Sequence, residues 1–403
     1  MFLAAGAGLW YHRLMETREK KRFGLTALFK ICPFAHSAAL LGAALLALHL
    51  LTRNNRSFTE KLVADYIHPF HLRAAELCAA LGNISLAEIL IWAFVLLLAG
   101  LVLFRLAGLF RPGKRLRSLY ALVMTLLSAA LLVYAGYSLL WGSYYYADDF
   151  AAEGGFEQRD ISVDELETVT KYFAGLLNEY GEQVSRDENG FYSIDKGDII
   201  ARSAEIYGNT EQLHPSLAGP ELPVKGIASS RLLSYMDYTG FFFPFTGEAC
   251  VNTDFPDSLF PSTVAHELAH QRRVAREQDA NFAAVLCCMV SGDVDYGYSG
   301  CLLAYTYLGN ALYDAAYSRW EAVYGSLSDC VLLDMSLNRA YWDQFETPVQ
   351  TVSNGFHEGL LQSYDQELGL KSYGACVDML VCYYLLQAQE WAAENNQISQ
   401  NNS

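Results

Sequence analysis

The sequence lacks any Cys-x-x-Cys pair, although it contains nine cysteines, and no group of Cys and His has the spacing of a structural zinc site. We therefore expect the cysteines to be small buried apolar residues. One or two disulfides in the C-terminal part are the alternative. The chain also lacks internal repeats and low-complexity segments. Its 403 residues are then enough for two or three folding units rather than a repeat array.

Positive charge is scarce in the C-terminal two thirds of the chain. Residues 143–403 hold 13 Lys and Arg against 38 Asp and Glu, a balance of −25, whereas residues 1–142 have a balance of +9. An acidic part of this size repels phosphate groups, so nucleic acid is excluded as a partner.

Charge is nearly absent from three long segments, at about 33–52, 89–110 and 119–141. Each has the roughly 20 residues that a helix needs to cross the hydrocarbon of a bilayer. Buried helices of a soluble core are the alternative. Three such segments with polar flanks within 110 residues favour transmembrane helices. We expect residues 1–142 to form a membrane domain whose partner is the lipid bilayer.

The loops between these segments give an orientation. Lys and Arg are concentrated before the first segment and in the link Arg111–Arg117. The positive-inside rule then predicts that the N-terminus and this link are cytoplasmic. Three crossings put everything after Trp141 outside, with Trp141 and Tyr144–Tyr146 as an aromatic belt at the outer interface.

The first loop contains a stretch with helical periodicity, Phe58–Leu81, that suits a helix on the membrane surface. His68 and His71 lie in it. Because no further ligand-type residues accompany them, we interpret both as interfacial residues rather than metal ligands.

Residues 143–394 have the composition of a separate, mainly α-helical domain with a small β-sheet. Ser162–Tyr180 is an amphipathic helix that begins with a capping box, and Thr239–Thr253 predicts two short strands joined around Thr246-Gly247-Glu248. Helices dominate from Pro261 onward. The polar stretch 395–403 is expected to be a disordered tail.

The chemistry of this domain centres on His266-Glu267-x-x-His270, the HExxH pattern. Residues four apart share one face of a helix, so both imidazoles can bind one metal ion. Glu267 is then placed beside a metal-bound water as its base. The alternative is an exposed helix on which His and Glu fall together by chance.

A catalytic zinc site usually takes a third protein ligand. The nearest downstream carboxylates are Glu277 and Asp279. On one continuous helix Glu277 would lie about two turns beyond His270, too far to share the ion, so the chain must turn near Arg273. Glu277 is our first choice and Asp279 the alternative. Asn281 is expected to hold a ligand by a hydrogen bond.

Other parts of the chain can complete such a site. The strand at about Glu248–Thr253 can present an edge to an extended peptide substrate. His357 and Tyr373 are candidates for stabilising the oxyanion or contacting substrate, although nothing in their spacing distinguishes them from structural residues.

The chain resembles a bacterial family of uncharacterised three-pass membrane proteins, domain of unknown function 3810. The matching motifs are Trp141-Gly142, Ser230–Met236, Pro244–Ala249 with Val251-Asn252, His266–Gln271 with Ala275–Glu277, Ala280–Phe282, Tyr298–Gly300 and Lys371–Gly374. The resemblance implies a zincin-like domain outside the bacterial cell membrane. It also implies His266, His270 and Glu277 as metal ligands and Glu267 as the base. The element from Glu277 to Asn281 is similar to the glutamate-ligand segment of gluzincin peptidases.

These observations predict a membrane-anchored, gluzincin-like zinc metallopeptidase that hydrolyses peptide bonds of a peptide or protein substrate outside the cytoplasmic membrane. One form of this hypothesis is a protease that processes other membrane proteins near the bilayer. The alternative is a non-enzymatic envelope protein in which the metal site is structural and the acidic ectodomain binds a partner.

Overall fold

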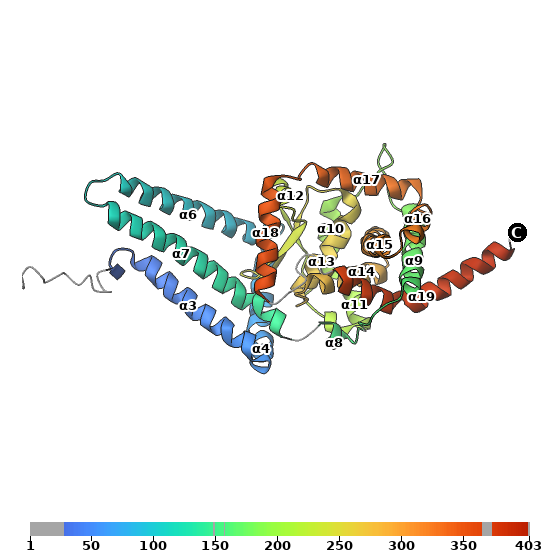
Figure 1. Ribbon diagram of the computed structural model, residues 1–403, viewed down its shortest axis with the longest axis horizontal. Helices are drawn as coiled ribbons and strands as arrows, with labels where there is room; N and C mark the ends of the chain where they lie inside the picture. The colour runs from blue at the N-terminus through green and yellow to red at the C-terminus, as the bar shows by residue number, and fades with distance from the viewer. Residues whose placement is uncertain (1–27, 148–149, 157, 365–372, 402–403) are drawn as a thin grey trace, which may run out of the picture. The chain divides into compact units, whose positions relative to one another are not determined.

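The computed structural model describes residues 28–147, 150–156, 158–364 and 373–401 (Figure 1). They are mainly helical and contain one small sheet, as the sequence predicted, and this sheet has three strands. They divide into two compact units. The membrane unit holds Ala93–Leu139 and the described residues up to His49, and the site unit holds Leu50–Trp92 and the described residues from Leu140 onward.

Three helices, α3 (Pro33–Asn54), α6 (Leu86–Leu109) and α7 (Arg115–Leu140), are long and apolar enough to cross a membrane. They coincide with the three predicted transmembrane segments. The ends of these helices that adjoin the first loop and Trp141 belong to the site unit. The basic N-terminal flank used for the orientation lies outside the described residues.

Within the membrane unit, α3 and α7 approach closely. A Cβ atom on Gly42 would lie 2.9 Å from Leu131, so only glycine allows this contact. A hydrogen bond of 2.8 Å between His36 Nε2 and the Tyr120 hydroxyl joins the same two helices. A shared polar contact of this kind is favourable in lipid because water is absent there.

The first loop is helical, as its periodicity predicted. It forms α4 (Arg56–Leu62), a π-helical turn (Val63–Ile67) and α5 (His68–Ala79). One face is buried within the site unit, at Val63, Ile67, His71, Ala75 and Cys78. His71 Nδ1 lies 3.1 Å from the Tyr144 hydroxyl, so this histidine packs against protein and not in the lipid interface.

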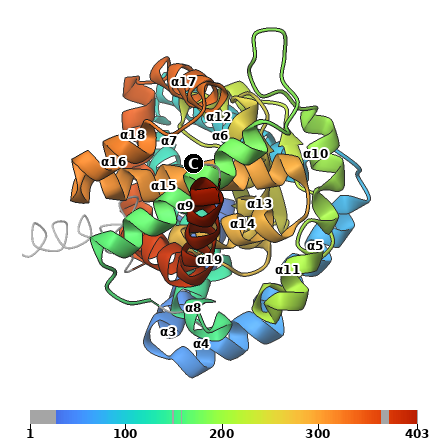
Figure 2. The ribbon, with the colours of Figure 1, turned by 90° about the vertical axis from the view of Figure 1, so that its right-hand side faces the viewer.

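Helices form most of the remaining site unit. They are α8 (Phe150–Gly154), α9 (Val163–Gly181), α10 (Lys196–Arg202), α11 (Gly208–Leu213), α12 (Ser230–Tyr235), α13 (Phe260–Gln271), α14 (Glu277–Val290), α15 (Val294–Ala315), α16 (Tyr317–Tyr324), α17 (Asp329–Asp343), α18 (Pro348–Ser363) and α19 (Tyr373–Asn401). The predicted capping box of α9 is present: Ser162 Oγ accepts from Glu165 N, and Glu165 accepts from Ser162 N. Helices α9, α14, α15 and α19 surround one continuous apolar core (Figure 2).

The sheet consists of β1 (Lys225–Ile227), β2 (Gly240–Phe243) and β3 (Glu248–Asn252) in the order β1-β3-β2. The hairpin of β2 and β3 was predicted, whereas β1, which runs parallel to β3, was not. Because β3 is central, the prediction that it offers an edge to substrate is wrong. The edge beside α13 belongs to β2, whose Gly240 pairs with Val251.

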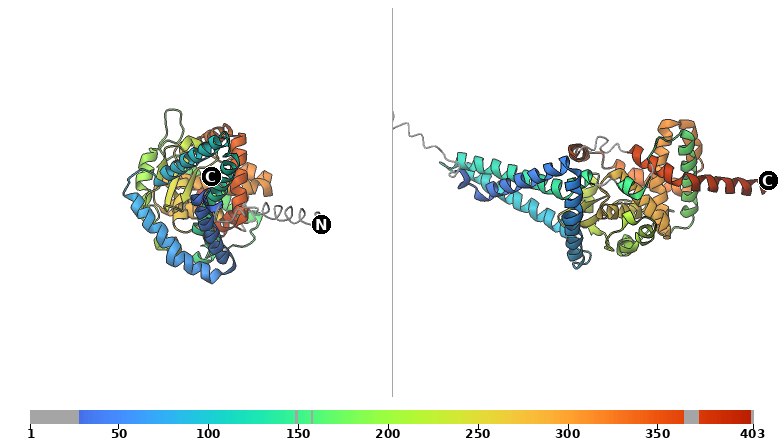
Figure 3. Two further views of the ribbon diagram at one scale, coloured as in Figure 1. Left: turned by 90° about the vertical axis from the view of Figure 1, so that its left-hand side faces the viewer. Right: turned by 90° about the horizontal axis from the view of Figure 1, so that it is seen from below.

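Three further expectations differ from the structure. Helix α19 runs to Asn401 and, in Figure 3, projects from the other helices, so 395–401 are helical rather than disordered. Trp141, Tyr144 and Tyr145 are buried in protein instead of forming a lipid-facing belt, because they fill the space around the sheet and α13. No disulfide joins any of the nine cysteines, so the possible disulfides are absent.

Candidate metal centre

Helix α13 carries His266 and His270 on one face of a largely buried helix. Pro261 lies in its first turn, where a missing N–H costs nothing. Apolar side chains such as Val264 and Leu268 are fully buried and fix the helix in the core. The two imidazole rings then lie edge to face, with centroids 4.7 Å apart.

The chain turns sharply after α13, as the sequence analysis required. Arg273 has φ +77°, the left-handed conformation that usually ends a helix at glycine. Arg273 N donates to His270 O and Val274 N donates to Ala269 O, each at 3.1 Å. This pair of hydrogen bonds is a Schellman motif, which reverses the chain within two residues.

A buried arginine holds this helix end in place. Arg272 is 2% exposed and its guanidinium lies 4.3 Å from the centre of the Tyr207 ring. It also donates to Pro220 O at 3.1 Å and pairs with Glu211 at 3.2 Å. The position of the turn is therefore determined by packing around the residue just before it.

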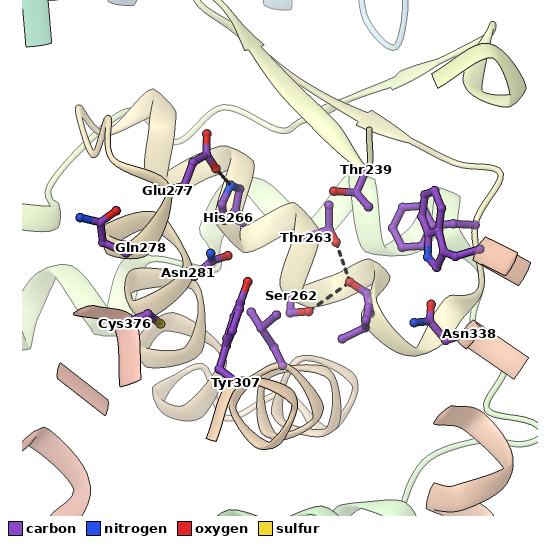
Figure 4. A pocket seen from close by; sticks show the side chains of 14 residues that line it. Thr239, Ser262, Thr263, His266, Glu277, Gln278, Asn281, Tyr307, Asn338 and Cys376 are labelled. Carbon is purple, nitrogen blue, oxygen red and sulfur yellow. Dashed lines mark hydrogen bonds and ion pairs between the residues drawn. The ribbon is translucent and has the colours of Figure 1, made fainter. Parts of the chain in front are cut away.

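The turn returns Glu277, the first residue of α14, to the two histidines. Glu277 Oε2 lies 3.3 Å from His266 Nε2 (Figure 4). The same oxygen lies 3.8 Å from His270 Nε2. Ligand atoms of all three residues lie within 4.8 Å of one another. Asp279, the alternative third ligand, is not in this group. Burial raises the pKa of the Cys376 thiol, and the nearby Asp279 carboxylate raises it further.

The turn also orients one of the histidines. His270 Nδ1 lies 2.7 Å from the carbonyl oxygen of Val274, which can only accept, so Nδ1 carries the proton. Nε2 is then the free ligand atom, and it faces Glu277. On another side, Trp141 packs edge-to-face on the His270 ring, with centroids 5.5 Å apart.

Glu267, between the two histidines, is 3% exposed. Its Oε2 atom has no hydrogen-bond partner among the described residues, an arrangement that is unfavourable unless another group completes it. A Cβ atom on Gly240 of β2 would lie 2.4 Å from Glu267 Oε1, so the strand passes directly over the carboxylate. Burial raises the pKa of Glu267 to about 7, the range in which a general base works at neutral pH.

The three clustered side chains are electrostatically coupled. Burial by itself would raise the pKa of Glu277 and lower that of His270. The hydrogen bonds between the histidines and Glu277 outweigh burial. They hold the pKa of Glu277 well below its usual value and raise the pKa of His270 to about 9. An ionised carboxylate facing two imidazoles favours a cation at their centre.

These residues fit a zinc ion. Two imidazole nitrogens and one carboxylate oxygen are a donor set used by catalytic zinc, which leaves one position for water or substrate. The 3.3 and 3.8 Å separations from Glu277 are each less than twice the zinc–ligand distance of about 2.1 Å. The unpartnered oxygen of Glu267 lies next to this set, where a water molecule would satisfy it.

A cavity of about 290 Å³ opens beside the cluster and runs along α13 toward its N-terminus. His266, Glu277 and Asn281 line one end of it, and Tyr307 and Thr239 border it farther along (Figure 4). Phe255, Leu259, Leu303 and Trp342 make its remaining wall largely apolar. Its volume is sufficient for a large side chain.

The other predicted site residues are not brought to the ligands. Asn281 lines the cavity, and no hydrogen bond joins it to His266, His270 or Glu277 within the described part of the chain. His357 packs against Tyr238 instead of the cluster, with ring centroids 5.5 Å apart. The side chain of Tyr373 lies outside the described residues.

The roles of Gly240 and Trp141 were not predicted from the sequence. Gly240 depends on the register of the hairpin over α13, for which the sequence carries no local signal. Trp141 was assigned to the lipid interface because it follows an apolar segment, and its contact with His270 spans 129 positions of sequence.

Together these features define a class: a membrane protein with three apolar helices near the N-terminus and a helical domain that gathers two histidines and a glutamate. The chain belongs to a family described as protein of unknown function (DUF3810), whose model matches residues 64–381. No curated protein and no solved structure matches it.

Proposed function

We propose that the protein is a membrane-anchored zinc metallopeptidase whose site lies outside the cytoplasmic membrane. The observation that supports this most strongly is the left-handed turn at Arg273, which brings Glu277 within 3.3 Å of His266 and within 3.8 Å of His270. The external location rests on the basic link Arg111–Arg117 and the positive-inside rule.

His266, His270 and Glu277 would hold the ion, and zinc bound there would polarise the scissile carbonyl and acidify a water molecule. Glu267 takes a proton from the attacking water and delivers it to the leaving amine. Burial raises the pKa of Glu267, which favours uptake of the proton from the water. Gly240 keeps the carboxylate in place by passing over it without a side chain.

The residues around the cluster suit a polypeptide substrate. Strand β2 pairs with β3 on one side only among the described residues, so its outer edge can accept an extended peptide. Thr239 at the start of this strand lines the 290 Å³ cavity. A peptide on β2 would therefore pass the cluster with one side chain in the apolar cavity.

Purified full-length protein in nanodiscs tests the proposal against a mixture of fluorogenic peptides of random sequence. We expect hydrolysis by the wild type and a loss of at least about a hundredfold in Glu267→Gln, as removal of a general base predicts. Glu182→Gln, at the exposed residue that caps the C-terminal end of α9, is the matched control. Glu267→Gln with full activity would exclude the proposed mechanism. Zinc bound to an inactive wild type would favour the structural-site alternative.

A further inference from the structure

Helix α18 exposes a stripe of large apolar side chains. Val349, Val352 and Phe356 are 53%, 72% and 72% exposed, and their spacing of three and four residues puts them on one face. The helix carries one acidic residue, Glu358, and no Lys or Arg. An uncharged apolar stripe is unusual on a domain with a balance of −25.

The opposite face of α18 packs on the segment that leads into β2. Asn354 Nδ2 donates to Asp237 Oδ2 at 2.8 Å, and the His357 ring lies 5.5 Å from the Tyr238 ring. Thr239, the next residue, lines the cavity beside the metal cluster. Helix α18 therefore borders the approach to the site.

The C-terminal end of α18 lies at the end of a transmembrane helix. Tyr364, which caps α18, stacks on Tyr145 with ring centroids 5.5 Å apart. A Cβ atom on Gly142 would lie 2.6 Å from the Tyr364 ring. Gly142 is two residues beyond Leu140, where α7 ends.

The N-terminal end of α18 is tied to a second transmembrane helix. Phe345, three residues before α18, packs on Tyr235 of α12, with ring centroids 5.0 Å apart. The Ser229 N–H, just before α12, donates to Glu88 Oε1 at 2.8 Å. Glu88 lies in the first turn of α6. The C-terminal end of α18 is thus attached beside the end of α7, and its N-terminal end is attached to the start of α6 through α12.

We propose that α18 lies along the outer surface of the membrane with Val349, Val352 and Phe356 in lipid. A helix with both ends held near span ends must run close to the bilayer plane, where an uncharged apolar stripe is favourable. The first turns of α6, in the same unit, also expose apolar side chains, since Ile89 and Trp92 are 50% and 41% exposed. Because both ends of α18 are held near the ends of transmembrane helices, we infer that bilayer lipid covers the apolar stripe.

The consequence for the site rests on the proposed peptidase function. Helix α18 touches Tyr238, and Thr239 lines the cavity, so a substrate enters next to a lipid-contacting helix. The substrate class is then a polypeptide held at the bilayer surface by a membrane segment or a lipid chain, which reaches the site more readily than a peptide free in solution.

Lipid contact is measured by fluorescence quenching in nanodiscs. Val352→Cys carries an environment-sensitive dye, with the partly exposed Cys330 and Cys382 replaced by Ser. Ser336→Cys, exposed on α17, is the matched control. Spin-labelled phosphatidylcholine should quench the dye at position 352 several-fold more than at 336, and iodide should show the reverse order. Equal quenching at both positions overturns the proposal.

The substrate class is tested with one cleavable peptide made with and without a palmitoyl chain. Anchoring in the bilayer raises the effective concentration of the palmitoylated peptide only while the site lies at the bilayer surface. Val352→Asp places a charge in the stripe that contacts lipid, so it should reduce cleavage of the palmitoylated peptide about tenfold and leave cleavage of the free peptide unaffected. Ser336→Asp should change neither rate. Equal loss on both peptides, or no loss on either, overturns the substrate assignment. A wild type that cleaves neither peptide refutes the peptidase function, whereas the quenching still decides the lipid contact.

Discussion

The Nδ1 atom of His270 lies 2.7 Å from the carbonyl oxygen of Val274, so the turn that ends α13 also fixes a ligand. The same turn returns Glu277 to the cluster. One backbone feature, Arg273 at φ +77°, thus determines both the third ligand and the orientation of the second histidine.

Substitutions at Arg273 should separate these effects. Arg273→Gly keeps the left-handed conformation, which costs a side-chain-bearing residue about 1–2 kcal/mol, so we expect retained zinc and equal or higher stability. Arg273→Pro fixes φ near −65° and removes the N–H that donates to His270 O. Zinc affinity should fall at least about tenfold, as loss of a ligand's orienting partner does. Titration with a zinc chelator measures it; unchanged affinity in Arg273→Pro would refute the role of the turn.

Gly240→Ala should impair catalysis and leave metal binding intact. Its methyl group would lie 2.4 Å from Glu267 Oε1 and 2.7 Å from the Cys250 carbonyl oxygen, so the carboxylate must move. A displacement of about 1 Å lowers peptide hydrolysis by roughly a hundredfold. Gly226→Ala in β1 is the control, because its methyl group would meet only the side chains of Thr253 and Ile200, at 3.2 and 3.3 Å. Similar rates for the two variants would contradict this role of Gly240.

The hairpin prediction and the missing strand show what local sequence can and cannot specify. Alternation around Thr246-Gly247-Glu248 is a short-range signal and predicted β2 and β3. Strand β1 has three residues and pairs in parallel across an intervening helix, so its signal is non-local.

The bend at Arg273 could be predicted from the geometry of a helix, because a continuous helix would carry Glu277 about two turns beyond His270. The choice between Glu277 and Asp279 could not, because both fall in the first turn of α14 and only the phase of that helix separates them.

Glu248 should prove important for stability although it lies outside the cluster. Its buried carboxylate accepts from the N–H groups of Leu86 and Ala87, at 3.0 and 2.7 Å, at the start of α6. Negative charge is favourable at a helix N-terminus. Glu248→Ala should reduce the free energy of unfolding by about 2–3 kcal/mol, seen as a lower melting temperature in detergent. Glu60→Gln, at a partly exposed residue paired with the exposed Arg56, should change it by less than about 0.5 kcal/mol.

Stability should fall as the solution is acidified below pH 6.5. Burial lowers the pKa of His71 to about 3 and that of His68 to about 4. The unfolded chain binds protons near pH 6.5, whereas the folded chain does not until lower pH. The contribution of these neutral histidines is therefore complete above pH 6.5 and is lost between pH 6.5 and about 3. His71→Gln should flatten the decline in melting temperature; an unchanged pH profile would contradict this assignment.

The most direct test is the zinc content of purified protein, measured by mass spectrometry after dialysis against metal-free buffer. We predict about one zinc per chain in the wild type and in Glu267→Gln, since catalytic zinc binds through three protein ligands and Glu267 is not one of them. His270→Ala and Glu277→Ala should lose the metal, and Asp279→Asn should retain it. A wild type without zinc, or full zinc content in Glu277→Ala, would contradict the account.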